Sequence, residues 1–198
     1  MGGLVDLDKA LFLWINNGLA SRWLDPLFYL WSQLGNAAVS FALVVALALI
    51  FKRPAFLKEH LPWLVAAALL GGVVVHWLKD LVGRDRPVEV FSQLVKAGKV
   101  HLHLVGAILS RSSFPSGHAQ LAFAMATYLS FALPRWWWAF LGIAAGVALS
   151  RIYMGVHFPA DCLAGAAIGA LSALVAWKSR EWFLRRRSGK GPVRGCSP

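Results

Sequence analysis

Five long apolar segments constrain the fold of this chain more than any other feature. They extend approximately over Asn36–Phe51, Leu61–Leu81, His118–Leu133, Trp136–Leu149 and Pro159–Trp177. A bilayer core is about 30 Å thick, so a spanning helix needs about 20 mostly apolar residues. The segments approach or meet this length, and 58% of all residues are hydrophobic, above the roughly 45–50% of soluble domains. We therefore expect an all-α, polytopic membrane bundle with five clear spans.

The first 34 residues are less regular. Their apolar face is interrupted by polar and charged residues at Asn16, Asn17, Ser21, Arg22 and Asp25. We expect one or two interfacial helices over residues 1–34, with a sixth, imperfect span as the alternative. A membrane-embedded bundle over residues 35–178 and a basic tail over residues 179–198 complete the expected division of the chain.

The basic residues indicate an orientation. The net charge is +11, and seven basic residues follow or end the last apolar segment: Lys178, Arg180, Arg185, Arg186, Arg187, Lys190 and Arg194. Such a tail suits a cytoplasmic anchor beside anionic lipid better than a nucleic-acid arm, and a solvated end is an equal alternative. If the five segments alternate across the bilayer, the basic loop at Lys52 and Arg53 lies on the same side.

The opposite face is also basic, against the usual bias of membrane proteins. Its cations are Lys79, Arg84, Arg86, Lys96, Lys99, Arg111 and Arg151. An anionic substrate held on that face would explain them. The mixed segment over residues 88–114 is expected to form an interfacial lid or ledge there.

The first polar motif, over residues 79–87, stands at the end of the second apolar segment. Lys79 and Arg86 are seven residues apart, about two helical turns, so both cations point the same way if the helix continues. Arginine holds a phosphoryl group with a bidentate fork, and lysine holds it with a compact charge. Taken alone, the motif is more typical of basic side chains that reach the membrane surface from a helix end.

The second motif, over residues 114–118, directly precedes the third apolar segment. Pro115 cannot continue a helix from upstream, Ser116 is a favoured N-cap, and Gly117 lets a ligand approach the backbone. A helix that begins here presents free N–H groups and its positive dipole end to an anion. A plain helix cap with an incidental His118 is the alternative.

The third motif, over residues 150–161, follows the fourth apolar segment. His157 and Asp161 are four residues apart, so the carboxylate can hold one imidazole nitrogen and leave the other free as a nucleophile. Arg151 adds a third cation. A structural His–Asp pair is the alternative, but ionisable residues at a membrane boundary favour a function.

Taken together, the three motifs resemble the signature of the type 2 phosphatidic acid phosphatases, the PAP2 superfamily. The matching positions, in order, are Lys79-x6-Arg86-Pro87, Pro115-Ser116-Gly117-His118 and Ser150-Arg151-x5-His157-x3-Asp161. This superfamily includes bacterial lipid phosphatases, glucose-6-phosphatase and the vanadium haloperoxidases. The resemblance implies a PAP2/haloperoxidase-like helical core within residues 35–178 and makes that bundle the catalytic part of the chain.

The resemblance also implies a role for each matched residue. His157 would attack phosphorus and form a phosphohistidine, Asp161 would orient its ring, and His118 would protonate the leaving group and then activate water. The phosphate oxygens would be held by Lys79, Arg86, Ser116, Gly117 and Arg151. No metal ion or other cofactor is implied, because the cations supply the charge stabilisation. Arg84 and Asp85 match no signature position and are interpreted as supporting charges.

Three further histidines, His76, His101 and His103, match no signature position, and we expect them to serve packing and interface polarity. The two cysteines, Cys162 and Cys196, indicate neither a disulfide framework nor a metal site.

A site at the ends of spanning helices suits a substrate whose chains stay in the outer leaflet. The resemblance implies hydrolysis of the terminal phosphate of lipid A 1-phosphate, phosphatidylglycerol phosphate or undecaprenyl pyrophosphate, which the motifs do not rank. The alternatives are a non-catalytic lipid-phosphate binder or transporter and a vanadate-dependent haloperoxidase, a class of soluble proteins. We expect a bacterial inner-membrane protein with a periplasmic site and a cytoplasmic C-terminus. Its expected partners are the bilayer and the lipid substrate, without nucleic acid or an obligate protein partner.

Overall fold

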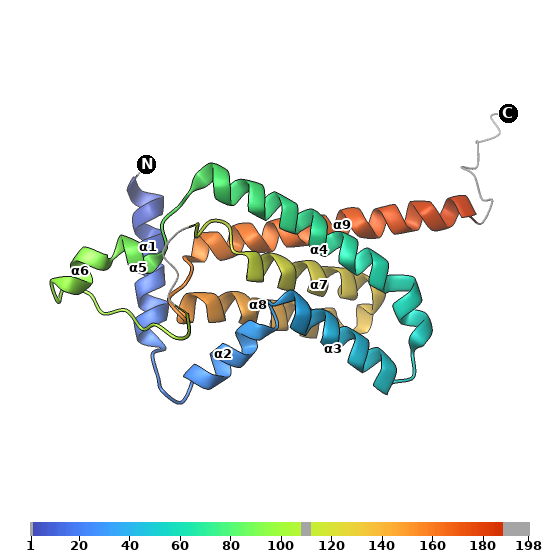
Figure 1. The fold of residues 1–198 in the computed structure, drawn as a ribbon, viewed down its shortest axis with the longest axis horizontal. Helices are drawn as coiled ribbons and strands as arrows, with labels where there is room; N and C mark the ends of the chain where they lie inside the picture. The colour runs from blue at the N-terminus through green and yellow to red at the C-terminus, as the bar shows by residue number, and fades with distance from the viewer. Residues whose placement is uncertain (1, 108–111, 188–198) are drawn as a thin grey trace.

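The computed structural model describes residues 2–107 and 112–187, and Figure 1 shows how its helices are arranged. Within these ranges the chain forms helices and no strands. The α-helices are α1 (Gly2–Gly18), α2 (Asp25–Gln33), α3 (Ala37–Ile50), α4 (Pro54–Val82), α5 (Pro87–Val90), α6 (Ser92–Lys96), α7 (Gly117–Ala132), α8 (Trp137–Tyr153) and α9 (Pro159–Arg187). A 3-10 helix, η1 (Pro134–Trp136), precedes α8. The expected all-α class is confirmed. Arg111, Lys190, Arg194 and Cys196 lie outside the described residues.

The helix boundaries follow local signals. Asn36 caps α3, and its side chain accepts a hydrogen bond of 2.9 Å from the backbone N–H of Ala38. Helices α4 and α9 begin at Pro54 and Pro159, where proline's missing N–H has no helical partner to lose. Helix α4 ends at Gly83, which has a left-handed φ of 57° that favours glycine. The chain can therefore leave α4 abruptly, and the next segment runs along the end of the bundle to α5 (Figure 1).

The number of membrane spans differs from the prediction. Two helical stretches, Pro54–Lys96 and Pro159–Arg187, are long and apolar enough to cross a membrane alone. Helices α2 and α3 meet at an angle of 76° and qualify together as a third. Helices α7 and α8 have 16 and 17 residues, fewer than the about 20 of a full span. The helices support an integral membrane protein with two or three such spans, so five clear spans are not confirmed.

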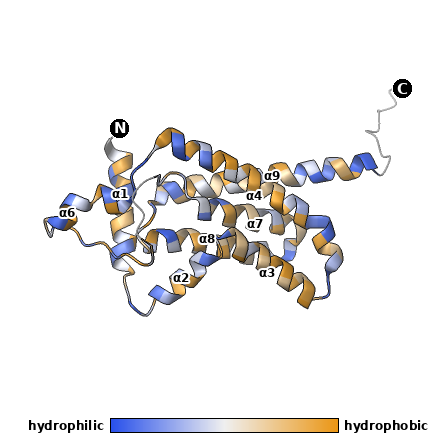
Figure 2. Cartoon of the chain, viewed as in Figure 1, coloured by the Kyte–Doolittle hydropathy of each residue, from blue (hydrophilic) through white to orange (hydrophobic). Residues whose placement is uncertain are grey.

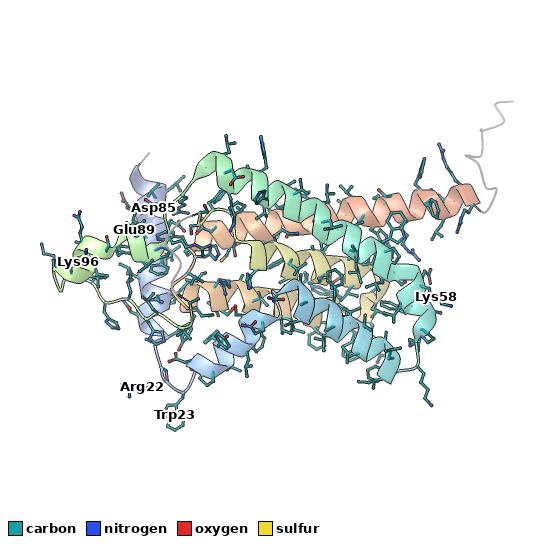
Figure 3. The ribbon with its side chains drawn as sticks, in the orientation of Figure 1. Arg22, Trp23, Lys58, Asp85, Glu89 and Lys96 are labelled. Carbon is teal, nitrogen blue, oxygen red and sulfur yellow. The ribbon has the colours of Figure 1, made fainter. Side chains whose placement is uncertain are left out.

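Hydrophobic residues follow the bundle helices along most of their length, whereas α6 and the end of α9 are hydrophilic (Figure 2). Helix α1 crosses one end of the bundle (Figure 1). Of the labelled residues in Figure 3, Asp85, Glu89 and Lys96 lie at that end and Lys58 lies at the other. The bundle thus has two polar ends separated by an apolar middle.

Helix α7 lies in the centre of the bundle and packs against α4, α8 and α9. Its contact with α4 and α9 is filled by fully buried side chains that include Leu64, Tyr128 and Ala173. Small residues bring α7 and α9 close together, since a Cβ atom on Gly165 would lie 2.3 Å from the carbonyl oxygen of Ser116. Because the second motif begins α7 and the third motif ends in the first turn of α9, this close packing fixes their separation.

A side chain at Gly169 is expected to destabilise the bundle. A Cβ atom there would lie 2.1 Å from the backbone oxygen of Gln120, so Gly169→Val forces α7 and α9 apart. We expect a loss of about 3 kcal/mol in the free energy of unfolding, visible as a lower Tm in detergent. The control is Gly142→Val on α8, where no atom lies within 4 Å of the added Cβ. Equal melting temperatures for the two variants would contradict this account of the α7–α9 contact.

Candidate active site

The third motif forms a buried histidine–carboxylate pair. His157 lies in the loop between α8 and α9, and Asp161 lies in the first turn of α9. Both side chains are buried, with 3.6 Å between His157 Nδ1 and Asp161 Oδ2. Ser113 donates a hydrogen bond of 2.5 Å to the same carboxylate oxygen, and the backbone N–H of Phe158 donates another of 2.8 Å. The carboxylate is thus fixed on the Nδ1 side of the ring, which leaves Nε2 to face the rest of the site.

The other ring nitrogen of His157 lies beside a cation. Arg86 Nη1 is 3.3 Å from His157 Nε2 and donates a hydrogen bond of 2.9 Å to the carbonyl of Val156. Burial lowers the pKa of His157 to about 4, and the charges of Arg86 and Arg151 act in the same direction, against the nearby carboxylate of Asp161. The imidazole is therefore neutral at pH 7, which is the form that can act as a nucleophile.

Arg151 and Lys79 add two more cations to this end of the bundle. Arg151 is buried near the end of α8 and donates a hydrogen bond of 2.6 Å from Nη1 to the hydroxyl of Ser32. Its Nε has no hydrogen-bond partner among the described residues, so it remains available to a phosphate oxygen. Lys79 lies in the last turn of α4, within electrostatic reach of Arg86, Arg151 and Asp161. Arg86 thus lies directly beside His157, and Arg151 and Lys79 are near enough to interact electrostatically with the histidine–carboxylate pair.

The second motif begins α7. Ser116 is its N-cap, and its hydroxyl lies 3.5 Å from the backbone N–H of Ala119. The backbone N–H of Ser116 donates a hydrogen bond of 2.9 Å to the carbonyl of Asp161, which joins the starts of α7 and α9. Gly117 and His118 follow in the first turn, and His118 is within electrostatic reach of His157. The start of α7, a helix end of the kind that can bind an anion, therefore lies beside the start of α9.

The segments that carry the eight predicted residues meet at the end of the bundle that α1 crosses (Figure 1). These segments are the end of α4, the residue before α5, the start of α7, the end of α8, the loop between α8 and α9, and the first turn of α9. Within residues 2–107 and 112–187, no group of three or more histidine, cysteine or acidic side chains has the arrangement of a metal site. One neutral imidazole, one fixed carboxylate and three cations can together hold a phosphate and attack it.

Comparisons with known proteins show the family to which the chain belongs. Residues 60–185 match the PAP2 superfamily, and this range contains all eight residues. This chain belongs to the PAP2 superfamily. The crystal structure of Aquifex aeolicus LpxE has a TM-score of 0.73 and 32% sequence identity to it, with 87% of this chain and 95% of that chain covered.

Several relatives of this PAP2 protein are similar over most of their length. An undecaprenyl-diphosphatase of Sulfolobus acidocaldarius is 34% identical over 84% of this chain and 75% of that protein. The bacitracin transport permease protein BcrC of Bacillus licheniformis is 30% identical over 87% of this chain and 80% of that protein. A lipid A 4′-phosphatase of Bacteroides thetaiotaomicron is 27% identical over 97% of this chain and 85% of that protein. The superfamily and these named phosphatases identify the PAP2 protein as a phosphatase.

Sequence reasoning missed residues that support the PAP2 site from elsewhere in the chain. Ser113 precedes the second motif and bonds to Asp161, while Ser32 lies on α2, 119 positions before its partner Arg151. Arg84, interpreted as a supporting charge, forms an ion pair of 2.6 Å with Asp161. Asp85, interpreted in the same way, is exposed. Nothing in the local sequence around Ser32 indicates that it binds Arg151. The contact becomes visible only when α2 packs against α8.

The three histidines outside the signature have different surroundings. His103 lies 2.7 Å from the carboxylate of Asp25 and is joined to Asn16 through its backbone, so it fastens the segment after α6 to α1 and α2. His76 is exposed on α4 beside Asp80, and His101 is exposed after α6. The expectation of packing and interface polarity describes His103 well.

Removing the Ser32 hydroxyl is expected to weaken the hold on phosphate. Without it, the buried Nη1 of Arg151 loses its 2.6 Å partner and the guanidinium is free to rotate. We expect Ser32→Ala to raise KM about tenfold, the usual cost of a hydrogen bond to a charged group. Steady-state phosphate release measures it, with Ser179→Ala, an exposed serine near the far end of α9, as the control. An unchanged KM would show that Ser32 does not position Arg151.

Proposed function

We propose that this PAP2 phosphatase removes the terminal phosphate of a membrane lipid phosphate or pyrophosphate through a phosphohistidine on His157. One observation carries the proposal. The buried, neutral ring of His157 has its Nδ1 facing Asp161 at 3.6 Å and its Nε2 beside Arg86 at 3.3 Å. A phosphoryl group bound by Arg86 would therefore stand next to the nucleophilic nitrogen.

The reaction has two steps in this arrangement. In the first, His157 Nε2 forms a bond to phosphorus as the bond to the leaving oxygen breaks, and His118, which enters this step in its protonated form, gives that oxygen a proton and becomes neutral. In the second, His118 takes a proton from water, whose oxygen bonds to phosphorus as the P–N bond breaks. Asp161 stabilises the positive ring of the intermediate, and the charge that spreads over the phosphate oxygens is held by Lys79, Arg86, Arg151, Ser116 and Gly117.

We propose lipid A 1-phosphate, phosphatidylglycerol phosphate and undecaprenyl pyrophosphate as the candidate substrates. The names of two relatives, undecaprenyl-diphosphatase and lipid A 4′-phosphatase, support lipids of this kind. A site at one end of an apolar bundle also suits a phosphate whose hydrocarbon chains stay in the bilayer. All three lipids present a terminal phosphoryl group. The residues directly around His157 would contact this shared group, so they do not distinguish one of the three lipids from the others.

We further propose a bacterial inner-membrane location with the site in the periplasm and the C-terminus in the cytoplasm. The cations outside the site support this orientation. The loop between α3 and α4, with Lys52 and Arg53, lies at the end of the bundle opposite the site, as does the basic end of α9 at Arg185–Arg187 (Figure 1). Cytoplasmic ends of membrane helices carry such an excess of lysine and arginine.

A second candidate function is a lipid-phosphate binder or transporter without turnover. The observation in its favour is the name of one relative, a bacitracin transport permease protein. The intact set of His157, Asp161 and His118 favours catalysis, because binding a phosphate needs cations but no nucleophile.

Phosphate release by the purified protein in detergent with EDTA separates the two functions. The substrates are phosphatidylglycerol phosphate, undecaprenyl pyrophosphate, lipid A, phosphatidic acid and glucose 6-phosphate. We expect turnover of at least one lipid in EDTA, faster than that of glucose 6-phosphate. Lipid binding without release of phosphate from any of them would overturn the catalytic proposal and support the binder.

A further inference from the structure

A second carboxylate, that of Asp8, is linked to Asp161 by Arg84, which binds both. Arg84 donates from Nη1 to Asp161 Oδ1 and from Nη2 to Asp8 Oδ2, each at 2.6 Å. The guanidinium lies 4.3 Å above the ring of Phe158, the residue after His157. Arg84 is thereby held on three sides, and its two carboxylate partners come from α9 and from α1.

Asp8 also contacts the start of α9 directly. Its Oδ1 accepts a hydrogen bond of 2.8 Å from the backbone N–H of Ala160, one residue before Asp161. A carboxylate is favoured at this position because the helix start is positively polarised. Asp8 is 8% exposed, whereas Asp6 on the same helix is exposed. A buried carboxylate is costly unless its charge is paired, and both Asp8 oxygens have partners.

The charges of Asp8, Arg84 and Asp161 together affect the stability of a positive charge on His157. Arg84 alone would neutralise Asp161, which faces His157 and must stabilise a positive ring when the phosphohistidine forms. With Asp8 bound to the second nitrogen, the group of Asp8, Arg84 and Asp161 carries one net negative charge beside His157. Asp8 thus restores the charge that Arg84 would otherwise cancel, while the ion pair keeps the Asp161 carboxylate in place.

We propose that Asp8 is a positioning residue for the His157–Asp161 pair, acting through Arg84 and through the start of α9. Helix α1 is then part of the catalytic assembly as well as a helix at its edge. The inference rests on the proposed function, since it assigns Asp8 to the same phosphohistidine step. It adds to that step a residue that lies outside all three sequence motifs.

The variant Asp8→Asn keeps an oxygen for the N–H of Ala160 but removes the negative charge at Arg84. We expect kcat to fall about 10- to 100-fold, in line with the loss of a charged hydrogen bond. KM stays unchanged, because Asp8 is placed beside none of the phosphate-binding groups. The controls Asp6→Asn and Asp85→Asn remove the same charge from exposed positions, on α1 and next to Arg84, and keep the wild-type kcat.

Two further comparisons separate positioning from a general loss of structure. In the double variant Asp8→Asn with Arg84→Gln, kcat equals that of Arg84→Gln alone if Asp8 acts through Arg84. Asp8→Glu and Asp8→Gln have the same shape and differ in charge, so they serve if Asp8→Asn does not fold. We expect higher kcat for Asp8→Glu than for Asp8→Gln.

The outcomes also distinguish this inference from the function on which it rests. If wild type releases phosphate, His157→Ala does not, and Asp8→Asn has the wild-type kcat, only the role of Asp8 is overturned. Equal kcat for the glutamate and glutamine variants, or additive losses in the double variant, would overturn it as well. If wild type itself releases no phosphate, the proposed function fails and the role of Asp8 fails with it.

Discussion

Replacing His157 by alanine is expected to abolish phosphate release while substrate binding persists. His157 is 2% exposed, and its imidazole lies between the carboxylate of Asp161 and the guanidinium of Arg86. Loss of a catalytic nucleophile lowers kcat on the order of 10^4- to 10^6-fold. Arg86 and Arg151 remain, so the lipid phosphate still binds.

The measurement pairs phosphate release with binding of the same lipid to purified His157→Ala in detergent. The matched control is His101→Ala, which removes an exposed imidazole and should keep the wild-type rate. An unfolding curve close to that of wild type shows that the variant is folded. Turnover by folded His157→Ala at more than a trace of the wild-type rate would rule out His157 as the nucleophile.

Replacing His118 by alanine is expected to separate the two steps of the reaction. His118 lies in the first turn of α7, within electrostatic reach of His157, and is proposed to protonate the leaving oxygen and then to activate water. With a lipid phosphate, whose alkoxide needs a proton to leave, kcat falls about 10^2- to 10^4-fold. With an aryl phosphate, whose phenolate leaves without a proton, the first step persists and only the attack by water is slow.

The predicted signature is a burst of phenol equal to the enzyme concentration, followed by slow steady release. Stopped-flow absorbance of His118→Ala with an aryl phosphate measures it, and His76→Ala, which removes an exposed imidazole on α4, is the control without a burst phase. If phenol is released slowly from the first turnover, without a burst, His118 is also needed for a part of the first step other than protonation of the leaving oxygen. That result would contradict the proposed roles of His118.

The local geometry of the three motifs was largely predictable from the sequence, because it depends on residues that are close together in the chain. His157 and Asp161 share a face at a spacing of four residues, and Ser116 caps the helix that carries His118. Lys79 and Arg86 were expected to point the same way along one helix, but α4 ends at Gly83, between them. Both still reach the site, because the chain turns back after that glycine and returns Arg86 to His157.

The rest of the site depends on packing that no local pattern reports. Asp8 lies 152 residues from its backbone partner at Ala160, and Ser32 lies 119 residues from Arg151. The sequence places both on helices expected at the membrane interface. In the sequence, Asp8 looks like an ordinary charged residue on the solvent side of a helix. It becomes a buried partner of Arg84 and Ala160 only because α1 lies across the end of the bundle.

The span count differed for a related reason. An apolar segment shows that a helix avoids water, but not whether lipid or protein covers it. Helix α7 is mostly apolar, yet it is buried among α4, α8 and α9 and has 16 residues. Helices α2 and α3 were assigned to separate parts of the chain, whereas together they form a bent pair that qualifies as one span.

Direct detection of phosphate on His157 tests the proposed mechanism most directly. The purified phosphatase is mixed with a lipid substrate labelled in its terminal phosphate, denatured under alkaline conditions that preserve phosphohistidine, and digested for mass spectrometry. We predict label on the peptide that contains His157, stable to alkali, lost in acid and absent from His157→Ala. Turnover with label on a different residue, or with no protein-bound label at any time in the first turnover, would contradict the phosphohistidine mechanism.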